Sequence, residues 1–234
     1  EQLSDYLLKG AVTNAVNVPS VSDDVLAQVG PYLTLGEMLG SFHMQIAKGG
    51  VEEVNIEYSG ELAELNTSPV TVAFLKGLFT PILKDAVNFV NAPIIAKDRG
   101  IRVVESKSDQ ADDFINTLSV KVTTSEGEDV LVGTVFGHNE PRLVRINDFR
   151  LEALPSGSML LVYNKDVPGV IGALGTTLGN AGVNISRMTV GREEESNQNV
   201  ILLSTDELTS KELLEKVLSL KNVADAQILD LPGL

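Results

Sequence analysis

The sequence predicts an α/β protein of the α+β kind, built from two consecutive units. We expect helices packed on a mostly antiparallel sheet in the first unit and a ferredoxin-like βαββαβ fold in the second. The first observation is a change of period: apolar residues recur every three to four positions over residues 34–50 and alternate with polar ones over residues 116–153. The second is the order strand–helix–strand–strand–helix–strand after residue 157, which is the ferredoxin-like order.

Two helices are predicted at the start of the first unit. Residues 21–30 look helical and are expected to end at Gly30–Pro31, because a proline inside a helix removes a hydrogen bond. The next stretch, "TLGEMLGSFHMQIAKGG", has Thr34 and Glu37 at the spacing of a capping box and ends at Gly49–Gly50. Its apolar stripe comprises Leu35, Met38, Leu39, Phe42 and Ile46.

The rest of the first unit changes from mixed to purely strand-like patterns. A half-buried strand, "VEEVNIEYSG", precedes a helix that Ser68–Pro69 opens and that runs to about Phe79. Two further helical stretches, "LKDAVNFVN" and "APIIAKDRG", lead to the short strand "IRVVE". The runs "NTLSVKVTT", "DVLVGTVFG", "RLVRIN" and "FRLEAL" are separated by turn-like pieces and predict an antiparallel meander.

The segment "PSGS", residues 155–158, is the best internal boundary, and it divides the chain into domains at 21–155 and 156–234. Apolar positions change phase between Ile185 and Met188, which predicts a bulge in that strand. Thr209 and Glu212 have capping-box spacing at the start of the last helix. The predicted elements are a strand at 158–163, a helix at 168–181, strands at 184–192 and 198–204, a helix at 210–220 and a strand at 223–229.

Composition limits the classes of function. The chain of 234 residues has a formal net charge of −14, which repels nucleic acid and anionic lipid, so neither is an expected partner. It has no cysteine, which excludes disulfides and thiolate metal sites and suits a reducing compartment, so we expect a cytoplasmic protein without a metal. No apolar run approaches the roughly 18 residues of a membrane span.

The turn "NKDVPGVIG", residues 164–172, carries the strongest candidate site. If a helix begins at Pro168, the N–H groups of Gly169 and Val170 point out of its positive end, where a carboxylate fits. Asp166, two residues before this helix, suits an ammonium group. The two charges of a free α-amino acid could therefore both be neutralised at this turn.

Two asparagines complete the predicted amino-acid site. Asn184 begins the strand after the helix, and we expect it to return to the neighbourhood of Asn164, where both amides can donate and accept. The predicted site comprises Asn164, Asp166, Pro168, Gly169, Val170 and Asn184. The simpler alternative is an ordinary turn, since Asp and Asn before Pro-Gly often bond to their own main chain.

Other features suggest no catalytic chemistry. The glycines from Gly169 to Gly179 form no G-x-G-x-x-G fingerprint, and no P-loop pattern exists. His43 is expected on the polar edge of a helix and His138 in the turn "GHNEP", so both are given surface or capping roles. The charged run "REEES" at 192–196 is expected to be a solvated hairpin tip. No catalytic residue is predicted.

A resemblance to known families adds to these expectations. The stretch "VYNKDVPGVIGALGTTLGNAGVNISRMTVGRE" resembles the ACT domain, a small regulatory module that binds amino acids, and the likeness covers 158–230. "YLTLGEMLGSFHMQIAKGGVEEVNIEYSGELA" and "RINDFRLEALPSGSMLLVYNKDVPG" are similar to the C-terminal half of long-form D-3-phosphoglycerate dehydrogenase, which has an extra domain before the ACT domain. "NAVNVP" ends the substrate domain in that family. Since the chain starts in what looks like mid-helix without Met, 1–20 is expected to be the tail of that preceding domain in a longer protein.

The resemblance implies what the longer protein does. It implies NAD-linked oxidation of 3-phosphoglycerate, the first step of serine synthesis, with L-serine or a related amino acid as feedback effector. The family's nucleotide-binding fold and catalytic residues would precede this chain, so the fragment itself is expected to hold no cofactor. The family's serine site carries over onto Asn164, Asp166 and Asn184. Self-association through ACT domains, into a dimer or tetramer, is also implied.

The extra domain is similar to one proposed to sense substrate or phosphate through basic residues. Arg142 stands where relatives place a cation, but a second family arginine would fall near Glu152, which is an acid. Arg145 or Arg150 could substitute, and the alternative is that all three arginines are solvated on a strand. Two other classes stay open: the small domain of an iron–sulfur L-serine dehydratase, and an oligomerisation module without a ligand.

Overall fold

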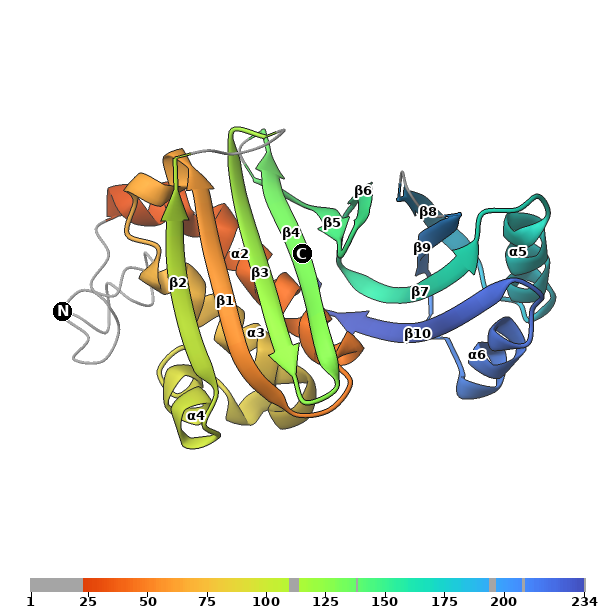
Figure 1. Cartoon of the computed structure of the whole chain (residues 1–234), viewed down its shortest axis with the longest axis horizontal. Coiled ribbons are helices and arrows are strands. Elements are labelled where there is room, and N and C mark those ends of the chain that lie inside the picture. Colours follow the sequence, from red (N-terminus) through yellow and green to blue (C-terminus); the bar gives the residue numbers. More distant parts are fainter. Residues whose placement is uncertain (1–22, 110–113, 138, 194–196, 208, 234) are drawn as a thin grey trace, which may run out of the picture.

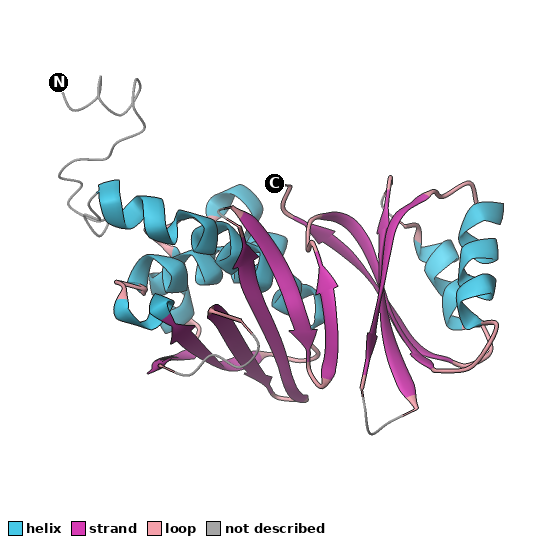
Figure 2. Cartoon of the chain, turned by 90° about the horizontal axis from the view of Figure 1, so that it is seen from above, coloured by secondary structure: helices cyan, strands magenta, loops and turns pink. Residues whose placement is uncertain are grey.

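The computed structural model describes residues 23–109, 114–137, 139–193, 197–207 and 209–233, which form one mixed sheet with helices packed against it (Figures 1 and 2). Ten strands follow the order β10-β7-β9-β8-β6-β5-β4-β3-β1-β2. Among the described pairs, β1 and β2 are parallel and the others antiparallel, which confirms the predicted fold class. The expected segment 1–20 and His138 lie outside the described residues.

The first half of the chain supplies one side of this sheet and most of its helices. No described helix is long and apolar enough to cross a bilayer. The elements are α2 (Asp23–Ile46), β1 (Val51–Gly60), η1 (Glu61–Glu64), α3 (Ser68–Leu83), η2 (Lys84–Ala86), α4 (Ala92–Asp98), β2 (Arg102–Ser108), β3 (Asn116–Thr124), β4 (Gly127–Phe136), β5 (Glu140–Ile146) and β6 (Phe149–Ala153).

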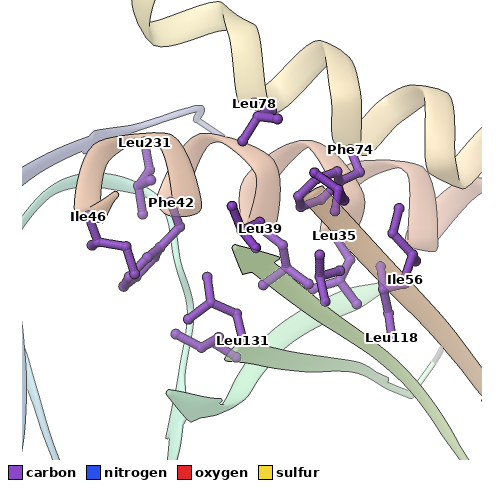
Figure 3. Close-up of a cluster of buried hydrophobic side chains, with 14 of the residues drawn as sticks. Leu35, Leu39, Phe42, Ile46, Ile56, Phe74, Leu78, Leu118, Leu131 and Leu231 are labelled. Atoms are coloured by element: carbon purple, nitrogen blue, oxygen red, sulfur yellow. The ribbon is translucent and has the colours of Figure 1, made fainter. Parts of the chain in front are cut away.

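The first two predicted helices are one continuous helix, α2, so the expected break at Gly30–Pro31 and the capping box at Thr34 are wrong. The apolar stripe continues across the proline, and its burial outweighs the hydrogen bond that Pro31 removes. Figure 3 shows this helix between the sheet and α3, with Leu35, Leu39 and Phe42 facing the strands. The buried stripe consists of Val29, Tyr32, Leu35, Leu39, Phe42 and Ile46.

The helix predicted over "LKDAVNFVN" is also wrong. The preceding helix α3 runs on to Leu83, and only the short η2 follows it. Beyond η2, the Asn88 side-chain oxygen accepts hydrogen bonds from the main-chain N–H of Val90 at 2.9 Å and of Asn91 at 3.0 Å. Such local bonds offer the backbone an alternative to the helix, so this stretch folds as a turn.

His43 lies in the core and not on a polar edge. It is 1% exposed, its Nε2 donates to the Val120 carbonyl at 3.2 Å, and its ring meets Phe74 edge-on. The reason is that α3 covers the face of α2 that would otherwise be solvated. Burial favours the neutral imidazole and lowers the pKa of His43 from 6.5 to about 3.

The second half of the chain has the predicted ferredoxin-like order. Its strands lie in the order β10-β7-β9-β8, and the register shifts between Ile185 and Arg187, which confirms the expected bulge. The last helix is capped by Ser210, whose hydroxyl accepts from the Leu213 N–H, in place of Thr209. The elements are β7 (Gly157–Lys165), α5 (Val170–Asn180), β8 (Ile185–Arg192), β9 (Gln198–Thr205), α6 (Lys211–Leu218) and β10 (Val223–Leu231).

The two groups of helices cover opposite faces of the sheet. Along β7, Leu160 and Val162 pack in the cluster beneath α5 and α6, whereas the alternate residues Met159 and Leu161 join the core that α2 covers. Because side chains of a strand alternate between faces, α2 and α5 lie on different sides. Of the helices that the structure describes, none packs on the α5 face over β1 to β5, and a ligand could reach the sheet there.

Candidate functional site

The connection from β7 to α5 has the features of a helix N-terminus that is open to a ligand. The helix begins at Val170 and not at Pro168, because Gly169 has a φ of 97° and acts as the N-cap. Glycine has no side chain to accept the first N–H groups, so the N-cap residue itself leaves them unsatisfied. The Asp166 N–H donates to the Asn197 carbonyl at 2.9 Å, which holds the turn against the start of β9.

Two buried asparagines lie at the end of β7 near this helix start. Asn164 is 3% exposed and its Nδ2 donates to the Lys165 carbonyl at 2.7 Å. Asn199 is directly opposite it in β9 and is 4% exposed. The Oδ1 atoms of both are buried and have no hydrogen-bond partner among the described residues. Buried acceptors of this kind are costly, so they call for a donor group that a ligand could bring.

Asn199 was missed by the sequence prediction. Its only signal in the sequence is its place in the strand. Asn199 directly precedes the apolar run of β9, and the alternation of side chains turns it to the same face as Ile201 and Leu203, which are both fully buried. A polar residue at such an inward position is unusual enough to mark a site. Its position opposite Asn164 could not be predicted, because it depends on the register between β7 and β9.

The Asp166 carboxylate is not tied to its own main chain. Its Oδ2 lies 3.5 Å from Nη2 of Arg192, the last residue of β8, and both side chains are partly exposed. Of the ordinary-turn alternative, in which Asp and Asn bond to their own main chain, the described hydrogen bonds show the Asn164 bond to the Lys165 carbonyl and none from the Asp166 carboxylate.

Asn184 is not beside Asn164 within one chain. The strand β8 starts opposite Thr205, whereas Asn164 lies opposite Asn199, six residues away along β9. At about 3.3 Å per residue, this separates the two amides by roughly 20 Å. Asn184 is exposed, and its Nδ2 donates to the Asp206 carboxylate at 2.8 Å. The expectation failed because β7 and β8 run in the same direction, so the start of β8 lies level with the start of β7.

The uncovered face of the sheet holds a pocket of about 360 Å³, hereafter the open-face pocket. The register of β4 and β5 shifts at Val144, which brings both Val144 and Arg145 to this pocket. The Arg145 Nε is buried and has no hydrogen-bond partner among the described residues. Polar lining is supplied by Glu57, Ser59, Thr117, Ser119, Arg145 and Arg150.

Arg142 is engaged elsewhere. Its guanidinium lies 2.6 Å from the Glu140 carboxylate and 3.8 Å from that of Glu152, and it stacks near the Phe136 ring. The acid at 152, unexpected for a phosphate site, thus serves as a partner of Arg142. Of the three predicted arginines, the structure brings Arg145 and Arg150 together and leaves Arg142 out. The described residues contain no cluster of three His, Asp or Glu that could hold a metal.

Comparison with known proteins agrees with this architecture. The family model of the D-3-phosphoglycerate dehydrogenase intervening domain matches residues 28–147, just over half of the chain. The chain belongs to the D-3-phosphoglycerate dehydrogenase family. The model of the ACT domain matches residues 158–222, which include the open helix end and both buried asparagines. These matches confirm the resemblance found in the sequence and disfavour the dehydratase alternative.

Relatives in this family align with nearly all of the chain. D-3-phosphoglycerate dehydrogenase of Methanocaldococcus jannaschii is 36% identical over 231 residues, which cover 99% of this chain and 44% of that protein. The enzyme of Synechocystis sp. is 37% identical, over 97% of this chain and 41% of the relative. The enzyme of Bacillus subtilis is 33% identical, over 99% of this chain and 45% of the relative. The chain thus spans less than half the length of these relatives.

Proposed function

We propose that this chain is the regulatory part of an NAD-dependent D-3-phosphoglycerate dehydrogenase and that it binds L-serine as a feedback effector. The whole enzyme would oxidise 3-phosphoglycerate to 3-phosphohydroxypyruvate, with NAD⁺ accepting the hydride, as the first step of L-serine synthesis. The family matches support domains at 21–155 and 156–234. The observation that carries the effector site is the pair of buried Oδ1 atoms, which have no partner among the described residues, beside a helix whose N-cap is a glycine.

Each group of the amino acid has a complementary partner at the β7–α5 turn. The ammonium group would pair with the Asp166 carboxylate, which in this structure pairs with the Arg192 guanidinium. The Oδ1 atoms of Asn164 and Asn199 would accept from the ammonium group or from the serine hydroxyl. The carboxylate would bind the first N–H groups of α5, those of Val170 and Ile171, at the positive end of the helix.

A second copy of the chain would complete this site. Asn184 lies too far along β8 to act within its own chain, so it would contribute from a neighbour. The register of the two strands places Ala153, the last residue of β6, level with Thr189 of β8. The segment of β8 from Ile185 to Met188 therefore has no β6 residue beside it. That free strand edge could pair with the same segment of another copy, as exposed edges of sheets tend to do. The proposed assembly is therefore a homo-oligomer joined through ACT domains.

Calorimetric titration of this chain with L-serine tests the effector site. We expect saturable heat with the unchanged chain, and Asp166→Ala should weaken binding at least about tenfold, since it removes a charge-assisted hydrogen bond. Asp98→Ala, at the exposed end of α4, is the matched control and should bind as the unchanged chain does. No heat with L-serine, or equal affinity for Asp166→Ala, would contradict the proposal.

A second ligand, an anion such as phosphate or the phosphate group of the substrate, is favoured by the open-face pocket. The buried and unpartnered Nε of Arg145 is the observation behind it. Titration with inorganic phosphate should give weaker binding after Arg145→Gln. Arg102→Gln should leave the affinity unchanged, because Arg102 is exposed on β2 and pairs with Glu53. Equal phosphate affinity in both variants would exclude this pocket.

A further inference from the structure

A row of polar residues crosses the sheet from the open-face pocket to the β7–α5 turn. Arg145 in β5 lies opposite Arg150 in β6, and Arg150 lies opposite Arg192 in β8. Arg192 lies opposite Asn199 in β9, which lies opposite Asn164 in β7. Residues directly opposite in antiparallel strands project to the same face. All five side chains therefore lie on the α5 side of the sheet, across the boundary between the two domains.

Three consecutive arginines in this row are unfavourable unless each has a counter-charge. Like charges directly opposite each other destabilise a pair of strands. Arg192 finds its counter-charge at Asp166, 3.5 Å away, and its side chain is 73% exposed, so it is free to turn. Neighbouring strands bring opposite Cα atoms within about 5.5 Å, so the Arg192 guanidinium can also reach the pocket beside Arg150.

We infer that Arg192 couples the two proposed sites. With no amino acid bound, Arg192 holds the Asp166 carboxylate. When an ammonium group takes Asp166, the guanidinium turns toward Arg150 and adds a third positive charge at the open-face pocket. An amino acid at the turn thereby favours an anion in the pocket, and the reverse holds equally, because coupling between two binding sites is reciprocal. This inference rests on the proposed function of both sites.

The close approach of β6 and β8 makes the coupling possible. Gly191 precedes Arg192, and a Cβ at this position would lie 3.0 Å from the Arg150 carbonyl oxygen and 3.2 Å from the Leu151 Cβ. The Thr189 hydroxyl also donates to the Glu152 carbonyl at 3.3 Å. These contacts fix the register that places Arg192 between the carboxylate and the pocket.

The test is calorimetry with both ligands. Inorganic phosphate is titrated into the chain with and without saturating L-serine, and L-serine with and without saturating phosphate. In the unchanged chain, each ligand should tighten the other by the same factor, about five- to tenfold. After Arg192→Gln both ligands should still bind, L-serine more tightly than before because its competitor for Asp166 is gone, and the coupling factor should fall to one.

Two further variants distinguish charge coupling from a structural effect. Arg192→Lys keeps the positive charge and should retain most of the coupling. Arg102→Gln, an exposed arginine of β2 outside the row, should behave as the unchanged chain does. If both ligands bind independently in the unchanged chain, or if Arg192→Gln keeps the coupling, the inference is overturned while the proposed sites stand. If either ligand fails to bind the unchanged chain, the proposed function fails and the inference falls with it.

Discussion

At the residue scale, Asn199 is a buried polar side chain whose position costs stability. Its side chain is nearly isosteric with leucine and sits in an apolar strand, yet its Oδ1 has no partner among the described residues. An unsatisfied buried acceptor costs about 1–3 kcal/mol, and an apolar group of the same shape removes that cost. Stability alone therefore does not explain an asparagine here, whereas the proposed effector site does.

Replacing Asn199 with leucine should change the stability of the fold and the affinity for L-serine in opposite directions. We expect Asn199→Leu to raise the free energy of unfolding by about 1 kcal/mol, measured by urea denaturation. The same variant should bind L-serine at least about tenfold more weakly, because the amide contact with the ligand is lost. A variant that is destabilised, or that binds L-serine with unchanged affinity, would show that Asn199 has a structural role only.

The buried imidazole of His43 predicts a loss of stability in acid. Its pKa is about 3 in the folded chain and 6.5 as the ordinary value, so the unfolded chain binds one more proton between these limits. The free energy of unfolding should then fall as the pH drops below 6.5, by up to about 1.4 kcal/mol per pH unit from this residue. Above pH 6.5 the imidazole is neutral in both states and contributes no pH dependence.

Urea denaturation at several pH values between 6.5 and 4.5 measures this slope. His43→Gln should flatten it, because glutamine can still donate to the Val120 carbonyl but does not titrate. The chain has two histidines, and His138→Gln is the matched control, which should keep the slope. An unchanged slope in His43→Gln would mean that the acid sensitivity arises from other groups.

The sequence predicted the turn residues of the site better than their partners. Asp166 and Gly169 of the proposed site could be predicted because turn and helix-end chemistry is local. Arg192 and Asn199 could not be predicted, because their proposed roles depend on which strands pair and in what register. Asn184 was misplaced for the same reason, since proximity was inferred from chain order.

At the element scale, the contact of α2 with α3 depends on two glycines. A Cβ at Gly40 would clash with the main-chain oxygen of Phe74, and a Cβ at Gly77 with that of Glu37. The helices thus approach closely enough for backbone to touch backbone. In α5, by contrast, a Cβ at Gly172 would meet nothing within 4 Å.

The same substitution should therefore have opposite effects in the two helices. Gly40→Ala should lower the free energy of unfolding by at least about 2 kcal/mol, because main-chain atoms must move apart. Gly172→Ala should raise it by up to about 1 kcal/mol, since alanine is the better helix former and has room. Thermal unfolding followed by circular dichroism measures both, and equal effects would contradict the described helix contact.

Local signals predicted most elements, but two predictions about helices of the first unit were wrong. The break expected at Pro31 is absent because the stripe from Val29 to Ile46 is buried as one surface. The helix predicted over "LKDAVNFVN" is a turn because the Asn88 side chain bonds to nearby N–H groups. In the first case burial outweighs the helix-breaking tendency of proline. In the second, side-chain hydrogen bonds outweigh the helix pattern of the sequence.

At the scale of the whole molecule, the two predicted domains share one sheet. The pair β6–β8 joins them on one side, and the Gln45 side chain joins them on the other. Its amide donates to the Asp230 carbonyl at 2.8 Å and accepts from the Asp230 N–H at 2.7 Å, as a neighbouring strand would. The order of elements predicted two domains, but only the register shows that they form a continuous sheet; their boundary near residue 155 stays a prediction.

Weakening this junction should make the halves unfold separately. Gly191→Ala places a Cβ 2.8 Å from the Val200 side chain and 3.0 Å from the Arg150 carbonyl, which should push β6 away from β8. Differential scanning calorimetry should then resolve two transitions in place of one. Gly127→Ala, in β4 with nothing within 4 Å, is the control and should keep a single transition. One transition in Gly191→Ala would show that the junction is not needed for cooperative unfolding.

The most direct measurement is a crystal structure of this chain grown with L-serine. We expect the ammonium nitrogen about 3 Å from the Asp166 carboxylate and the ligand carboxylate on the first N–H groups of α5. We also expect that Asn164 or Asn199 bonds to the ligand and that Arg192 leaves Asp166. Serine bound elsewhere, with the pair of Asp166 and Arg192 intact and both Oδ1 atoms still unpartnered, would contradict the proposed effector site.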